Sequence, residues 1–169
     1  MNINLEQTIL RNLLTNDEYM RKVGAFLAPD YFQGPYKGLF KEVTKFVAKY
    51  NKLPSLEAFK IEIDENNTMG EDDYRQGVDR LPDLFTPEPE NLDWLIERTE
   101  KWWQDRAVFN AVMESISIID GKHEHLSKNA LPDILTKALG VSFDTNVGHD
   151  YLENVEERYE FYHRVEERI

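Results

Sequence analysis

A chain of 169 residues, 41% of them hydrophobic and 12% aromatic, is long enough for one domain, or one domain with an appendage, and its composition excludes a disordered chain. The absence of cysteine excludes disulfides and thiolate metal sites and is typical of a reducing cytoplasm. A net charge of −12 argues against a domain that binds nucleic-acid phosphates through its overall field. The chain begins without the features of a signal peptide and has no long apolar run, so we expect a cytoplasmic protein without a membrane partner.

Residues 1–85 predict a head of five short helices, because apolar side chains recur at helical spacing between proline- and asparagine-containing breaks. Pro35 and Ser55 suit helix starts, and Pro82 is expected to end the last helix of the head. Three further starts are predicted as capping boxes: Asn4 with Gln7, Thr15 with Glu18, and Thr68 with Glu71. No segment alternates as a strand would, so we predict an all-α fold.

The third predicted helix carries the one basic row of the chain. Lys37, Lys41, Lys45 and Lys49 follow one another at intervals of four residues, which places them on one helical face. Like charges at this spacing repel by a few tenths of a kcal/mol, so the row does not stabilise the helix. Three interpretations remain open: a solvated face, a contact for an acidic partner, or a weak contact for DNA.

Residues 86–91 form an acidic connector with two prolines, and residues 92–119 predict one uninterrupted helix. Its stripe recurs at spacings of three and four: Leu92, Leu95, Thr99, Trp102, Arg106, Phe109, Met113 and Ile116. At 1.5 Å per residue the helix is a rod on the order of 42 Å long. The head alone cannot cover such a rod, so we expect a second helix, a second subunit, or both, to cover the remainder.

Apolar positions from Leu131 to Phe143, with Pro132 in the first turn, predict a returning helix, so residues 92–144 should form an antiparallel hairpin. Trp102 and Trp103 lie about 100° apart on a helix, so one can face the returning helix while the other faces elsewhere. Five residues are the predicted oligomer or partner interface: Trp94, Trp102, Trp103, Arg106 and Phe109.

Residues 145–169 begin with a polar break and continue as an amphipathic segment. Tyr151, Val155, Tyr159 and Tyr162 lie on one helical side, and the opposite side is almost wholly charged. Residues 1–143 leave no obvious groove for this stripe, so we expect it to dock elsewhere and the chain to be part of a longer protein.

Residues for catalysis, cofactor binding or metal binding are not predicted. The phosphate-binding motif G-x-x-x-x-G-K-[ST] does not occur, so we expect no nucleotide cofactor in this chain. His123 and His125 lie with Asp120 and Glu124 in a turn, which favours solvent-exposed residues over a metal site. Glu160 with His163 is a single E-x-x-H, whereas a di-iron bundle needs two such motifs and two more inward glutamates.

The order of these segments resembles the N-terminal domain of DnaB-type hexameric replicative helicases, closest to the T-even-type phage group. The resemblance covers essentially the whole chain and rests on these stretches: EQTILRNLL at 6–14, FLAPDYFQGPYKGLF at 26–40, LPSLEAF at 53–59, the long helix with Arg106 in its middle, PDILTKALGVSFD at 132–144, and DTNVGHDYLENVEERYEFY at 144–162. Tyr36 departs from the pattern, because many relatives carry histidine there, so no role of that histidine is transferred.

The resemblance implies a ring collar in which heads and hairpins pair into dimers, which associate as a trimer of dimers. It implies primase, and a helicase loader, as docking partners, and the cytoplasm of an infected bacterial cell as the location. ATP, Mg²⁺ and most single-stranded DNA contacts are expected only in an ATPase domain outside this chain. Tyr151, Val155, Tyr159 and Tyr162 match the helix that docks on a neighbouring ATPase domain.

Two other classes stay open at the level of sequence. A free-standing helical adaptor or loader of the replisome would use the same surfaces without a motor domain. An all-α metal or phosphate enzyme would need the turn histidines to bind metal.

Overall fold

The computed structural model describes residues 3–66 and 68–143. Within these ranges the chain is all-α, as predicted, with no strand. The helices are α1 (Ile3–Thr15), α2 (Asp17–Val23), α3 (Pro35–Tyr50), α4 (Leu56–Glu65), α5 (Glu71–Leu84), α6 (Leu92–Ile119) and α7 (Leu131–Leu139), with short 3-10 turns at Gly24–Phe26, Pro29–Tyr31 and Lys128–Ala130.

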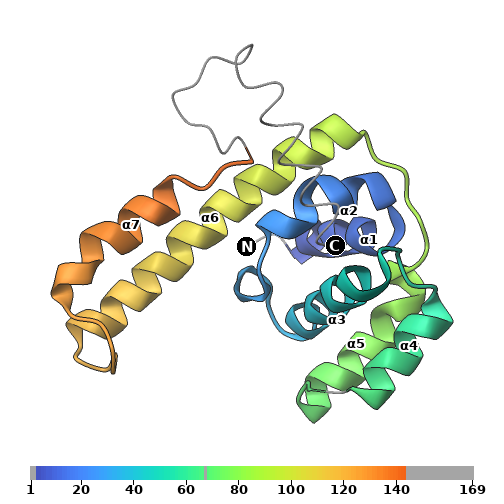
Figure 1. Cartoon of the computed structure of the whole chain (residues 1–169), viewed down its shortest axis with the longest axis horizontal. Helices are drawn as coiled ribbons and strands as arrows, with labels where there is room; N and C mark the ends of the chain where they lie inside the picture. Colours follow the sequence, from blue (N-terminus) through green and yellow to red (C-terminus); the bar gives the residue numbers. More distant parts are fainter. Residues whose placement is uncertain (1–2, 67, 144–169) are drawn as a thin grey trace.

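Helices α1 to α5 gather into a head, and the first half of α6 lies across it (Figure 1). The second half of α6 projects away from the head with α7 running antiparallel beside it. This arrangement is the predicted hairpin. The return is shorter than its sequence pattern, because α7 ends at Leu139 and the chain continues through Val141 to Phe143 without helix.

One hydrophobic core joins the head to the hairpin. Leu10, Leu13 and Leu39 are fully buried at its centre, and Trp102 and Trp103 of α6 belong to the same cluster. A second, small cluster of alanines lies between α6 and α7. The core of the head is therefore incomplete without the first half of α6.

Three predicted capping boxes are wrong. Helix α1 already begins at Ile3, so Asn4 lies inside it, and the Gln7 side chain donates to Asp83 instead. Asn16 caps α2 by accepting from the Tyr19 N–H at 3.1 Å. Gly70 precedes α5 without a side-chain cap, in place of Thr68. By contrast Ser55 caps α4 as expected, because its hydroxyl oxygen accepts from the Ala58 N–H.

Pro82 was expected to end α5 but lies inside its last turn. The missing proline N–H is tolerated there, because the helix runs only two residues further and its end is closed by other donors. The Phe85 N–H donates to the Leu81 carbonyl at 2.9 Å, and the Thr86 hydroxyl donates to the Pro82 carbonyl at 2.7 Å.

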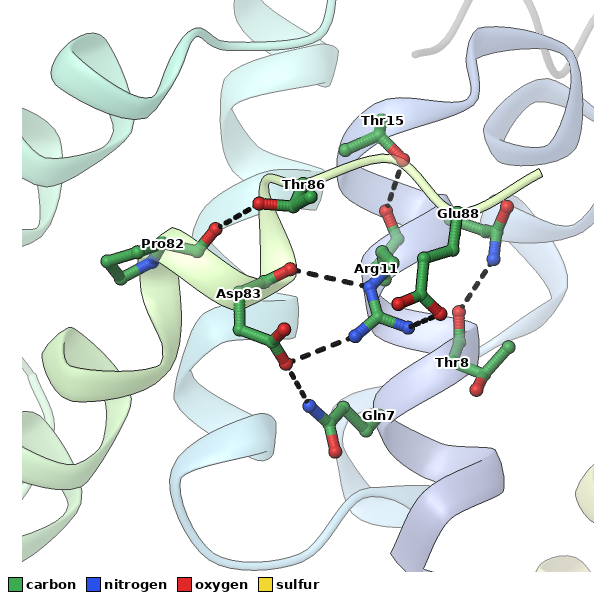
Figure 2. A network of polar contacts seen from close by, with 9 residues as sticks. Gln7, Thr8, Arg11, Thr15, Pro82, Asp83, Thr86 and Glu88 are labelled. Carbon is green, nitrogen blue, oxygen red and sulfur yellow. Dashed lines mark hydrogen bonds and ion pairs between the residues drawn. The ribbon is translucent and has the colours of Figure 1, made fainter.

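A polar clasp built on Arg11 of α1 holds the end of α5 and the connector to α6 (Figure 2). The Arg11 side chain is only 8% exposed and forms ion pairs with Asp83 at 3.1 Å and Glu88 at 3.2 Å. Its Nε also donates to the Asp83 carbonyl. Because Glu88 lies in the connector, the clasp fixes the direction from which the chain enters α6.

Residues 145–169, and with them the predicted docking residues Tyr151, Val155, Tyr159 and Tyr162, lie outside the described residues. The Glu160 and His163 motif does so too. None of the helices in the described ranges is long and apolar enough to cross a membrane.

Candidate assembly interface on the hairpin

Helix α6 spans Leu92–Ile119, as the sequence predicted, and runs for 28 residues. Asn91 caps it, since its side-chain oxygen accepts from the Trp94 N–H at 2.9 Å. The predicted stripe does not stay buried throughout. Leu92 is partly buried, the stripe is buried from Leu95 to Arg106, and Phe109, Met113 and Ile116 are each about half exposed.

The head covers one side of the first half of α6. Leu95 and Thr99 are fully buried, and the Tyr19 hydroxyl shares a hydrogen bond of 2.6 Å with the Thr99 hydroxyl. Burial raises the pKa of Tyr19, which keeps its hydroxyl protonated. The Arg106 Nε donates to the Tyr31 carbonyl at 3.0 Å, and its guanidinium lies over the Phe109 ring.

Helix α7 covers a second side, along the projecting half of α6. Ala107, Ala111 and Ala138 pack against one another, and their small side chains let the two helices approach closely. The Gln104 side chain donates to the Val141 carbonyl at 3.1 Å, which fastens the end of the return to the rod.

The two tryptophans face different surroundings, as predicted. Trp102 packs on Phe32 of the head, with ring centroids 5.0 Å apart. Trp103 stacks on Phe143 at the end of the return, also at 5.0 Å. Both side chains are almost fully buried, as is Arg106. These three residues therefore act on any interface by supporting their neighbours, whereas Trp94 and Phe109 reach the surface.

Within residues 3–66 and 68–143, no other element covers a third side of α6. Large apolar side chains on or bordering this side are between 44% and 56% exposed: Trp94, Phe109, Val112, Met113, Ile116 and Ile119. Leu135 and Leu139 of α7 are exposed on the neighbouring helix. We call the α6 residues Trp94, Arg98, Lys101, Asp105, Phe109, Val112 and Ile116 the open face.

A hollow of about 300 Å³ interrupts the open face near its middle. Trp102 and Arg106 contribute to its lining, and Leu5 of α1 contributes from the head. Glu6 of α1 is buried nearby, accepts from the Gln33 N–H at 2.6 Å and interacts with the Arg106 charge. Burial raises the pKa of Glu6, against the lowering effects of that hydrogen bond and of Arg106.

The lysine row lies on α3, in the head. Lys37 pairs with Asp30 at 3.3 Å, and Lys49 lies over the Tyr50 ring. Lys41 and Lys45 are exposed. Lys45 and Lys49 line a hollow together with Glu42 of α3, Glu62 of α4 and Asn66, the residue after α4. Carboxylates of the chain itself thus lie beside part of the lysine row. The acidic partner and the DNA contact predicted for the row stay predictions.

The predicted turn histidines organise the tip of the hairpin. The His123 Nδ1 accepts from the N–H groups of His125 and Leu126 at 3.2 and 3.1 Å, and its Nε2 lies 3.6 Å from Glu114. Among residues 3–66 and 68–143, no group of three or more potential ligands is placed to hold a metal ion.

Sequence reasoning missed Val112 and Ile119 as exposed apolar positions and missed the Arg11 clasp. Val112 is not part of the predicted stripe of α6. Only the position of α7 decides which side of the helix is covered. The clasp joins residues more than 70 positions apart, for which a single sequence carries no local signal.

Comparison with known proteins agrees with the resemblance inferred from the sequence. No protein-family model matches the chain. A DnaB-like replicative helicase of Enterobacteria phage T4 is 35% identical over an alignment of 162 residues, which covers 90% of this chain and 34% of that helicase. The chain thus spans about a third of the length of this relative. It is therefore a relative of DnaB-like replicative helicases, matched over one portion of such a protein.

Proposed function

We propose that this chain is the N-terminal collar domain of a DnaB-like replicative helicase, and that it joins subunits and docks replisome proteins while a separate ATPase domain unwinds DNA. The carrying observation is the 35% identity over 90% of the chain to a DnaB-like replicative helicase of which it spans only 34%. A motor needs a phosphate-binding loop, and the sequence contains no such motif.

The open face supports the assembly part of this proposal. Monomeric proteins rarely leave a long contiguous apolar surface in water, and burying such surface contributes roughly 25 cal/mol per Å². Val112 and Ile116 are 44% and 46% exposed in the projecting second half of α6, where side chains cannot fold back onto the head. The DnaB resemblance implies that a second subunit covers this surface.

The remaining partners rest on the resemblance. Primase, and a helicase loader, would dock on the head or the hairpin of the assembled collar. Tyr151, Val155, Tyr159 and Tyr162 would dock on the neighbouring ATPase domain, which would also hold ATP, Mg²⁺ and single-stranded DNA. Lys37, Lys41, Lys45 and Lys49 would offer a contact to an acidic partner or a weak contact to DNA.

Two experiments test the proposal. The reading frame should continue beyond Ile169 into an ATPase domain with a phosphate-binding loop, whereas a stop codon there would support a free-standing adaptor. The isolated chain, added in excess to the complete helicase, should enter mixed rings and inhibit unwinding, because it brings an assembly surface without a motor.

A matched pair of variants makes the second experiment specific. The double variant Val112→Asp and Ile116→Asp should fold but lose the inhibition, because buried unpaired carboxylates are strongly unfavourable. Ile61→Asp on α4 changes an equally exposed apolar residue away from the hairpin and should inhibit as the unchanged chain does. If the unchanged chain, the double variant and Ile61→Asp all inhibit equally, or if none of them inhibits, the hairpin has no role in assembly.

A further inference from the structure

Three ammonium groups of the lysine row on α3 form no ion pair within residues 3–66 and 68–143: those of Lys41, Lys45 and Lys49. All three side chains are exposed. Lys37, the first of the row, differs because it pairs with Asp30 at 3.3 Å. Like charges four residues apart on a helix repel one another. A ligand that brings negative charge to the last three lysines would relieve this repulsion.

The spacing of these lysines matches an extended peptide. Residues four apart on an α-helix are separated by about 6 Å along its axis, so the row from Lys41 to Lys49 spans about 12 Å. Alternate side chains of an extended chain point to the same side, and three of them span about 13 Å. Three alternate carboxylates of one extended segment would therefore meet the three ammonium groups without bending.

A hollow of about 110 Å³ lies at the far end of the row, between α3 and α4. Lys45 and Lys49 line it together with Phe46 and Tyr50, whose ring centroids are 4.7 Å apart. Phe46 is partly buried, and Tyr50 is 48% exposed. An apolar side chain next to the carboxylates of the peptide would pack on these two rings and remove part of the exposed aromatic surface from water.

The rings favour a peptide over a nucleic acid. Single strands bind through aromatic faces on which bases stack. Here the Phe46 and Tyr50 rings contact each other at 50°, and the Lys49 ammonium lies 5.2 Å from the centroid of the Tyr50 ring.

The carboxylates in the hollow favour a peptide as well. Glu42 and Glu62 line it, and Glu42 interacts with the Lys45 charge. A nucleic-acid strand brings a phosphate with every nucleotide, which these carboxylates repel. A peptide can place an uncharged side chain beside them and still offer carboxylates to the lysines.

We propose that α3 binds an extended acidic peptide segment of a partner protein, with alternate carboxylates on Lys41, Lys45 and Lys49 and an apolar side chain on Phe46 and Tyr50. The proposal rests on the docking role proposed for the head, and it chooses between the acidic partner and DNA for the lysine row. It does not depend on how the subunits assemble.

Fluorescence anisotropy with two labelled peptides tests the spacing. The probe is Asp-Ser-Asp-Ser-Asp-Ser-Phe, and its control contains the same residues with the three aspartates adjacent. The chain should bind the probe with a dissociation constant between about 10 µM and 1 mM, as a few exposed contacts allow. The control should bind at least about threefold more weakly, because adjacent side chains of an extended segment point to opposite sides.

Variants of the chain test each contact. Lys45→Glu should raise the dissociation constant of the probe about three- to tenfold, since an attractive exposed pair becomes repulsive. Lys122→Glu, at an exposed position in the tip of the hairpin, makes the same change in net charge and should shift it by less than about twofold. Tyr50→Ala should weaken the probe but not a peptide in which serine replaces the phenylalanine.

Charge reversal separates lost contacts from misfolding. The triple variant Lys41→Glu, Lys45→Glu and Lys49→Glu should bind a probe with lysine in place of each aspartate at least about tenfold more tightly than the unchanged chain does. It should also prefer alternate lysines to adjacent ones. Misfolding does not produce a gain of binding that keeps this preference.

The outcomes separate this proposal from its alternatives. A single-stranded oligothymidine that binds more tightly than the probe, and that Lys45→Glu weakens, overturns the proposal in favour of nucleic acid. Equal affinity for the probe and its adjacent-aspartate control, or no binding at about 1 mM peptide, overturns it as well. Lys45→Glu should still inhibit the complete helicase as the unchanged chain does. Inhibition without peptide binding therefore rejects the peptide site alone, and peptide binding without inhibition rejects the assembly role alone.

Discussion

The indole ring of Trp103 stacks on the phenyl ring of Phe143, with centroids 5.0 Å apart and planes inclined by 28°. Phe26 packs on both rings, at 5.9 Å from Trp103 and 5.2 Å from Phe143. The three aromatic residues come from the head, the rod and the end of the return. Their contact fixes the hairpin on the head at its root, so α6 presents the open face in one orientation.

Replacing Trp103 tests this junction. Trp103→Ala should lower the free energy of unfolding by about 3–5 kcal/mol, the usual cost of removing a large buried aromatic side chain. Trp103→Phe should cost clearly less, because the buried indole N–H has no hydrogen-bond partner in the described structure and no such bond is lost. Urea denaturation of the variants measures both. Equal losses would mean that the stacking geometry matters more than the buried volume.

Removing a carboxylate from the clasp should destabilise the head. Asp83→Ala leaves the buried Arg11 guanidinium with fewer acceptors, and hydrogen bonds to charged groups contribute about 1.5–3 kcal/mol each. Asp79→Ala, at an exposed position of the same helix, is the control and should change stability by less than about 0.5 kcal/mol. Thermal unfolding compares the two, and similar midpoints would show that the clasp adds nothing to stability.

The buried Glu6 predicts a pH dependence of stability. Because burial raises its folded-state pKa, the folded chain holds the proton more tightly than the unfolded chain does. The stabilisation is fully present below the ordinary pKa of 4.5 and is lost as pH rises through the raised value. Glu6→Gln should therefore become more stable relative to the unchanged chain between pH 4.5 and pH 7. Urea titrations across this range measure the difference. Glu90→Gln, in the exposed connector, should show no such trend.

Gly77 offers a stabilising substitution. A Cβ there would lie 3.5 Å from the Leu39 Cδ2 atom, an ordinary contact, so Gly77→Ala should gain about 0.5–1 kcal/mol of helix stability. At Gly24 a Cβ would lie 2.7 Å from the Met20 sulfur, so Gly24→Ala should show no such gain. Calorimetric midpoints decide, and a loss at Gly77 would mean that α3 and α5 pack without room to adjust.

The long helix could be predicted to the residue, because its apolar period continues over 28 residues and Asn91 and Asp120 bound it. The head's helix starts were less predictable. The capping-box pattern named Thr15, but Asn16 is the residue with extended backbone in a position to cap α2. Several polar residues compete at such boundaries, and the packing of the following helix selects among them.

The candidate interface could be predicted only in part. Periodicity identified the stripe of α6, but it cannot say which part of the stripe the head and α7 cover. Trp102 and Arg106 lie in the same pattern as Phe109, and only the tertiary fold buries the first two and exposes the third. Contacts between distant segments, such as Arg11 with Glu88, follow from the fold alone.

The mass of the 169-residue chain in solution, measured by sedimentation equilibrium over a concentration series, tests the assembly account most directly. We predict a reversible dimer for the unchanged chain and for Ile61→Asp. We predict a folded monomer for the double variant Val112→Asp and Ile116→Asp, with the helical content checked by circular dichroism. A monomer at all concentrations for the unchanged chain, or a dimer that survives the double variant, would contradict the claim that subunits join through the open face of α6.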